Sequence, residues 1–193
     1  MQQNTKGPNN PMPKEWLANK LSLKYIADYK PFNFVDGEGV RCSLYVSGCP
    51  FHCPGCYNVA AQNFHFGQPY TQELEDQIID DMRQPYVQGL TLLGGEPFLN
   101  TQVCIQLCKR VRKEFGNQKD IWSWSGYTWD ELMKESYDKI KLLSLIDILV
   151  DGRFLESQKD LTLQFRGSAN QRIIKVQDSL EQNRVVLWEH LIH

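Results

Sequence analysis

The 193-residue chain has no long apolar run, and its basic residues do not gather into one stripe. The first absence argues against a transmembrane helix, and the second leaves no electrostatic footprint for nucleic acid. Residues 1–13 lack the apolar core of a signal peptide. We therefore expect a cytoplasmic protein that binds neither membrane nor nucleic acid, with residues 1–19 as a mobile N-terminal extension and residues 20–193 as a single domain.

The six cysteines are unevenly spread, because Cys49, Cys53 and Cys56 fall within eight residues. Without a secretion signal, such clustering indicates metal binding or catalysis rather than disulfide crosslinks. Cys104 and Cys108 are four residues apart on the apolar face of a predicted helix. We expect these two to pack in the core, where free cysteine is common.

Apolar strands alternate with amphipathic helices along the chain. Strands are predicted within 20–34 and at 41–46, 90–93, 121–125, 146–150, 172–176 and 185–188, and helices at 70–87, at 101–115 and from a capping box at 128–131. This order indicates an α/β fold with a mostly parallel sheet and outer helices. A complete eight-stranded barrel typically needs about 250 residues. We therefore expect a partial, open (β/α) barrel with its functional site at the C-terminal ends of the strands.

Residues 48–58 form a compact loop with the spacing C-x3-C-x2-C, in which two prolines and two glycines allow tight turns. Thiolates bind zinc or iron–sulfur clusters. A structural zinc site needs four ligands, and His52 or Cys42 could supply the fourth in a small zinc-binding interaction module. A four-iron cluster with three cysteine ligands is the second interpretation. It leaves one iron with an open position for chemistry.

Residues 94–97, with the sequence Gly-Gly-Glu-Pro, follow the predicted strand at 90–93. Two glycines at the end of a strand let the backbone approach a ligand closely, and Glu96 offers a carboxylate to an ammonium group. Taken alone, the same pattern fits an ordinary turn equally well.

The cysteine loop followed by residues 94–97 resembles the radical S-adenosylmethionine (SAM) family. The resemblance implies a 4Fe-4S cluster on Cys49, Cys53 and Cys56, with SAM bound at the open iron. It further implies that SAM contacts Gly55, Cys56 and Tyr57 through its adenosyl part and Gly94, Gly95 and Glu96 through its methionyl end. Reductive cleavage of SAM would then give a radical that abstracts a hydrogen atom, so no catalytic residue is expected beyond the cluster and SAM.

Four further segments narrow the resemblance to the activating proteins of anaerobic ribonucleoside-triphosphate reductases. They are residues 36–41, 124–128, 151–154 and 166–172. That family implies an oxidoreductase that forms a glycyl radical on the large subunit of the reductase and takes electrons from a flavodoxin- or ferredoxin-like donor. An activating enzyme of another glycyl-radical enzyme, such as pyruvate formate-lyase, is the alternative within this class. A plain interpretation of the third segment is a surface ion pair between Asp151 and Arg153.

Overall fold

The computed structural model describes residues 7–189, which form one open, mixed sheet of seven strands in the order β3-β1-β2-β4-β5-β6-β7. The strands are β1 (Tyr25–Asn33), β2 (Val40–Val46), β3 (Gln68–Pro69), β4 (Val87–Gly94), β5 (Asp120–Trp124), β6 (Ile148–Asp151) and β7 (Arg172–Lys175). The central strands β2, β4, β5 and β6 are parallel, whereas β1, β3 and β7 join antiparallel at the edges. The predicted open α/β fold is confirmed.

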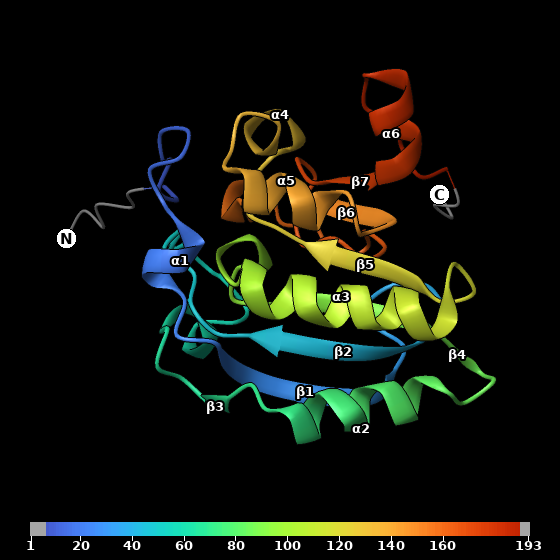
Figure 1. The fold of residues 1–193 in the computed structure, drawn as a ribbon. Coiled ribbons are helices and arrows are strands. Elements are labelled where there is room, and N and C mark those ends of the chain that lie inside the picture. The colour runs from blue at the N-terminus through green and yellow to red at the C-terminus, as the bar shows by residue number, and fades with distance from the viewer. Residues whose placement is uncertain (1–6, 190–193) are drawn as a thin grey trace.

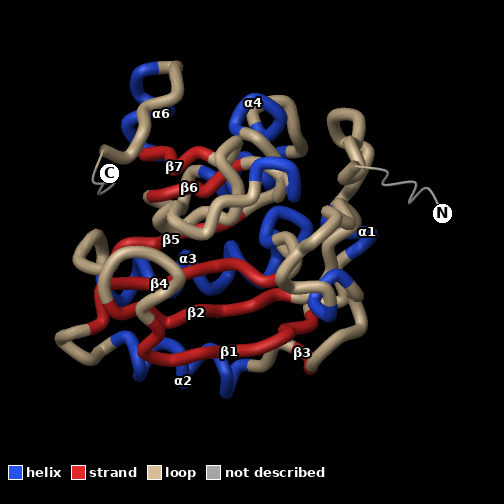
Figure 2. Tube along the Cα trace, turned by 180° about the vertical axis from the view of Figure 1, so that it is seen from behind, coloured by secondary structure: helices blue, strands red, loops and turns tan. Residues whose placement is uncertain are grey.

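The helices lie mainly on one side of this sheet (Figure 1). They are α1 (Ala18–Leu21), α2 (Gln72–Met82), α3 (Thr101–Phe115), α4 (Trp129–Leu132), α5 (Tyr137–Leu143) and α6 (Val176–Gln182), with short 3-10 turns η1 (Ala60–Gln62), η2 (Pro97–Leu99) and η3 (Glu156–Gln158). Seen from behind, the strands face the viewer and loops cross in front of them (Figure 2). Among residues 7–189, no helix combines the length and apolar character needed to cross a membrane.

The core lies between the sheet and the helices packed on it. Helix α3 turns an apolar face inward that includes Cys104 and Cys108, both fully buried, which confirms the prediction for these two residues. Helix α4 starts at the predicted capping box, in which Thr128 and Glu131 bond each other's backbone amides. These helices cover one face of the sheet, and the loops after β2, β4, β5 and β6 follow the C-terminal ends of the parallel strands.

Two predicted elements differ from the structure. The helix predicted over 70–87 ends at Met82, because residues 83–86 turn and Val87 already belongs to β4. The strand predicted at 185–188 is wrong, since this segment makes only an isolated bridge between Ile174 and Leu187. The Lys175 amide donates to the Val186 carbonyl and the Trp188 amide donates to the Ile173 carbonyl, but the Val186 amide donates to the Ser179 hydroxyl, so the pairing with β7 does not extend into a strand.

The N-terminal prediction falls partly outside the described residues, which exclude 1–6. Within the described part, Asn9 and Trp16 contact the domain through hydrogen bonds. The mobility of residues 1–19 as a whole stays a prediction.

Candidate metal and cofactor site

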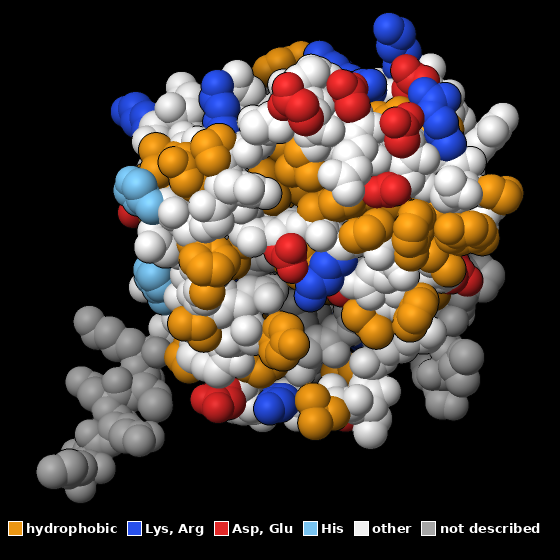
Figure 3. Space-filling view, turned by 90° about the horizontal axis from the view of Figure 1, so that it is seen from below, with side chains coloured by type: hydrophobic (Ala, Val, Ile, Leu, Met, Phe, Trp, Pro, Cys, Tyr) orange, Lys and Arg blue, Asp and Glu red, His pale blue; other side chains and the backbone are white. Residues whose placement is uncertain are grey.

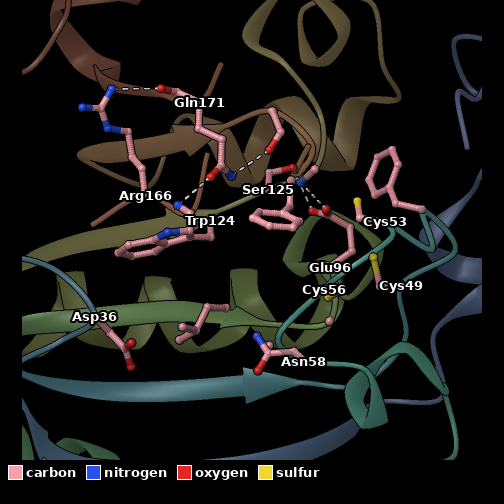
Figure 4. A pocket seen from close by; sticks show the side chains of 18 of the residues that line it. Asp36, Cys49, Cys53, Cys56, Asn58, Glu96, Trp124, Ser125, Arg166 and Gln171 are labelled. Carbon is pink, nitrogen blue, oxygen red and sulfur yellow. Dashed lines mark hydrogen bonds between the residues drawn. The ribbon is translucent and has the colours of Figure 1, made fainter. Parts of the chain in front are cut away.

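A cavity of about 420 Å³ opens at the C-terminal ends of the central strands. Its wall includes Cys49, Cys53 and Cys56 after β2, residues 94–96 after β4, residues 124–126 after β5, Gly152 after β6, and Arg166, Gly167 and Gln171 before β7. Figure 4 shows that the labelled residues of this wall come from separate elements. The cavity therefore lies where the sequence predicts the functional site.

The cysteine loop is bent sharply enough to bring all three thiols to this wall. The backbone is left-handed at Gly48, His52 and Gly55, with φ values of +99°, +49° and +72°. At the base of the loop, the Gly48 amide donates to the Ala61 carbonyl at 2.7 Å. All six cysteines are free thiols. The loop thus presents three unpaired sulfur atoms on one side of the cavity.

The surroundings of two of the cavity thiols disfavour the deprotonated, negatively charged form. Burial raises the pKa of Cys49 well above its ordinary value, and the nearby Glu96 charge raises it further. Burial also raises the pKa of Cys53. A bound cation removes this cost, because a coordinating thiol is deprotonated outright. The all-sulfur donor set therefore suits a soft metal centre.

The arrangement of the donors also bears on the kind of centre. Among residues 7–189, no three His, Cys, Asp or Glu side chains are positioned to hold a single metal ion. A four-iron cluster binds each cysteine through a different iron, so its ligands lie farther apart. The two candidates for a fourth zinc ligand lie away from the cavity wall: His52 is exposed and bonds Gln62, and Cys42 is fully buried in the core.

Glu96 is the buried carboxylate of the cavity, with 1% of its surface exposed. It accepts hydrogen bonds from the Phe98 amide at 3.0 Å, the Ser125 hydroxyl at 2.9 Å and the Gly126 amide at 2.8 Å. Burial raises the pKa of Glu96 to about 7, although these three donors act in the opposite direction. The carboxylate is therefore fixed in one orientation by the end of β5 and by η2 (Figure 4).

The glycine pair brings two backbone segments into close contact. A Cβ on Gly95 would lie 2.7 Å from the Gly48 carbonyl oxygen and 2.9 Å from the Ala61 carbonyl oxygen. The Glu96 amide donates to the same Gly48 carbonyl at 2.9 Å. Only glycine at position 95 lets the turn pack directly on the residue that precedes Cys49.

We expect Gly95→Ala to destabilise the protein by about 1–3 kcal/mol, because the added methyl group meets backbone atoms that cannot move aside cheaply. Urea unfolding of the metal-free protein measures this change. Gly7→Ala is the matched control, since nothing lies within 4 Å of a Cβ at Gly7. Equal stability of the two variants would contradict the expected close packing.

The wall opposite the cysteines is polar and carries an incompletely bonded guanidinium. Arg166 donates from Nη1 to the Gln171 carbonyl at 3.1 Å, while its buried Nε has no hydrogen-bond partner in the described structure. The Gln171 side chain accepts from the Gly167 amide at 2.9 Å and donates to the Gly152 carbonyl at 3.0 Å. Trp124 donates to the Phe165 carbonyl at 3.1 Å. These bonds join the loop before β7 to the ends of β5 and β6.

Residues 35–174 match the model of a protein family described as the 4Fe-4S single cluster domain. A protein of Escherichia coli K12 named anaerobic ribonucleoside-triphosphate reductase-activating protein is 44% identical over 147 residues, which cover 74% of this chain and 93% of that protein. Its namesake in Vibrio cholerae is 46% identical over 149 residues, or 75% and 94% of the two chains. The namesake in Enterobacteria phage T4 is 33% identical over 162 residues, or 83% and 95%.

The chain belongs to the family of anaerobic ribonucleoside-triphosphate reductase-activating proteins. The match to the 4Fe-4S single cluster domain spans the cysteine loop, residues 94–97 and the segment 166–172. All three segments contribute residues to the one cavity. The segments that carried the resemblance in sequence are therefore neighbours in space.

The site residues predicted from this family fall into two groups. Cys49, Cys53, Cys56, Gly94, Gly95 and Glu96 all line the cavity. Gly55 and Tyr57 do not: Tyr57 is 98% exposed and lines a separate hollow beside Phe34 and Val35. The roles of these eight residues stay predictions.

The family segment at 151–154 has a structural role that differs from the plain interpretation. Asp151 and Arg153 do not pair with each other. Asp151 is 1% exposed, accepts from the Trp129 amide at 2.7 Å and pairs with Arg172 at 2.5 Å. Arg153 pairs with Glu131 at 2.9 Å. The interpretation as one surface ion pair is therefore wrong, and the two charges instead tie β6 to β7 and to α4.

Most residues of the cavity wall were not singled out as site residues from the sequence, and Ser125, Gly126 and Arg166 are among them. Ser125 and Gly126 hold Glu96, and Arg166 forms part of the cavity wall. The available signal was their position in the segments 124–128 and 166–172, two of the four that carried the resemblance in sequence. Nothing in those segments indicates that they approach the cysteine loop.

Proposed function

We propose that this chain activates an anaerobic ribonucleoside-triphosphate reductase by generating a glycyl radical on its large subunit, through reductive cleavage of SAM at a 4Fe-4S cluster. The observation that carries this proposal is the single cavity shared by Cys49, Cys53, Cys56 and the buried Glu96. The names of the relatives supply the target enzyme. The open seven-stranded sheet supports a partial (β/α) barrel of the radical SAM type.

In this proposal the three cysteines bind the cluster as thiolates and leave one iron for SAM. When bound here, the cluster and SAM would supply the one-electron chemistry needed to remove a hydrogen atom from the substrate, with the electron coming from an external reductant. Glu96 would accept a hydrogen bond from the ammonium group of SAM through Oε2, to which the Gly126 amide alone donates among residues 7–189. Gly94 and Gly95 line the cavity beside Glu96, and we place the adenosyl part against the backbone around Gly55, Cys56 and Tyr57. The buried setting of Glu96 limits the contact of its carboxylate with water.

The surface beside the cavity supports a protein substrate. Phe34, Val35 and Tyr57 are 73%, 68% and 98% exposed and share one hollow, and Val35 also lines the cavity itself. Hydrophobic side chains gather in several groups on the face shown in Figure 3. Exposed hydrophobic groups next to an active cavity are typical of protein interfaces. We place the large subunit of the reductase here, and a flavodoxin- or ferredoxin-like protein as the electron donor.

Anaerobic reconstitution with iron and sulfide tests the proposal. We expect about four irons per chain and an electron paramagnetic resonance spectrum that changes when SAM is added. A glycyl radical signal should appear only when this protein, SAM, a reductant and the large subunit are combined. A folded product that takes up one zinc and no iron would favour the zinc-binding interaction module instead. A signal with pyruvate formate-lyase, but none with the reductase, would favour the other class of activating enzyme.

A further inference from the structure

The N-terminal segment 9–16 lies against the cysteine loop. The Asn9 amide donates to the Phe51 carbonyl at 2.8 Å, and the Asn9 side chain donates to the Pro50 carbonyl at 2.7 Å. Pro50 and Phe51 lie within the spacer between Cys49 and Cys53. The segment precedes residue 35, where the family match begins. A part of the chain outside the family domain therefore contacts the loop that carries the thiols.

A buried ion pair anchors this segment. Lys139 is fully buried and donates to the Glu135 carboxylate at 2.9 Å and to the Trp16 carbonyl at 2.7 Å. The Lys14 amide donates to the other oxygen of the same carboxylate at 3.0 Å. Buried charges are stable only when their hydrogen-bonding capacity is met. The segment supplies an acceptor to the lysine and a donor to the glutamate, so its position is built into the fold.

Phe51 is the residue on which these contacts converge. Its ring is 1% exposed and packs edge-on against Trp16 at 5.0 Å and Tyr127 at 4.9 Å between ring centres. The Arg153 guanidinium lies 4.6 Å from the centre of the same ring, and its Nε donates to the Asn9 carbonyl at 3.0 Å. The phenylalanine is therefore enclosed on one side by the domain and on the other by the N-terminal segment.

Phe51 in turn contacts both parts of the cavity. Its backbone amide donates to the Cys49 sulfur, which lowers the pKa of that thiol against the larger effect of burial. Its ring lies against Gly126, where an added Cβ would be 2.5 Å from the ring. The Gly126 amide is the donor to Oε2 of Glu96. A shift of Phe51 would therefore change the surroundings of both the Cys49 thiol and the Glu96 carboxylate.

We propose that residues 9–16 form a strap that fixes Phe51, and that Asn9 and Trp16 are positioning residues for the cysteine loop. This inference rests on the proposed function, because it takes Cys49 and Cys53 as cluster ligands. The strap keeps the Phe51 amide directed at the Cys49 sulfur. Amide donors stabilise the more negative, reduced form of a cluster, and hydrogen bonds to the sulfurs help to set its potential.

Full-length Asn9→Ala and Trp16→Ala test the strap after anaerobic reconstitution. We expect iron loss to a chelator to accelerate on the order of fivefold, as for the loss of one hydrogen bond or one ring contact. We also expect a more negative midpoint potential, followed by electron paramagnetic resonance in a redox titration. Trp16→Phe keeps an aromatic ring and should restore both properties toward those of the unaltered protein.

Asn10→Ala is the matched control, because the Asn10 side chain bonds only the Pro8 carbonyl among the contacts given for it. It should leave iron loss and potential unchanged. If Asn9→Ala keeps both the rate and the potential of the unaltered protein, or if Asn10→Ala changes them equally, the strap is refuted. Asn9→Ala removes one exposed side chain and should leave the fold intact, so it tests the strap even if Trp16→Ala fails to fold. An unaltered protein that binds no iron would instead refute the proposed function.

Discussion

Cys53→Ala is expected to give a folded protein that holds no stable cluster and does not cleave SAM. Only three cysteines line the cavity, so none is available to replace a lost ligand. A four-iron cluster is normally held by four thiolates, and the proposed site already has one fewer. Iron content and visible absorption report the cluster, and chromatography of free methionine reports the cleavage of SAM.

Cys108→Ala is the matched control for this loss. Cys108 is fully buried on α3 and does not line the cavity. We expect this variant to cost about 1 kcal/mol of unfolding free energy, as for a typical core substitution, and to retain both the iron and the cleavage of SAM. Cleavage retained by Cys53→Ala, or a cluster lost only from Cys108→Ala, would overturn the assignment of ligands.

Glu96→Gln is expected to weaken SAM binding by about 100-fold while the cluster stays in place, since a hydrogen bond to a charged group contributes about 1.5–3 kcal/mol. The substitution removes the negative charge that would meet the ammonium group. It also sets an amide NH₂ against one of the three donors that now point at the carboxylate. Equilibrium dialysis of the reconstituted protein with SAM measures the change in affinity.

Glu73→Gln provides the comparison, because Glu73 lies exposed in the first turn of α2. This variant should bind SAM as the unaltered protein does. An affinity of Glu96→Gln within a factor of two of the control would exclude the proposed role of the carboxylate. Loss of iron from Glu96→Gln would show that this residue supports the cysteine loop instead of SAM.

The sequence predicted those parts of the fold whose signal is local. The apolar stripe of α3 and the capping box of α4 depend on residues three or four apart, and both elements begin where they were expected. The antiparallel direction of β7 depends on its pairing with β6, which no local pattern encodes. The segment 185–188 has the composition of a strand, but hydrogen bonds to Ser179 and to β7 decide its path.

In the candidate site, too, the local motifs could be predicted from the sequence and the tertiary contacts could not. The three cysteines and residues 94–96 belong to short motifs whose chemistry can be interpreted directly from the sequence. Ser125 reaches Glu96 only because β4 and β5 are adjacent parallel strands that end at the same edge of the sheet. The contact between Asn9 and Phe51 joins residues that no periodicity relates. Such contacts depend on tertiary packing and were therefore not available from the sequence.

The closed base of the cysteine loop has a consequence for how the cluster is assembled. Hydrogen bonds from the Gly48 amide to the Ala61 carbonyl and from the Cys49 amide to the Gln62 carbonyl join the two ends of the loop without any contribution from the thiols. The loop is thus a compact surface loop with its ends already held together. On the proposed ligation, iron and sulfide need to order only the tip around Cys53 and Cys56. Most of the conformational entropy is lost on folding, before any metal arrives, and a preorganised site of this kind favours rapid and reversible loading.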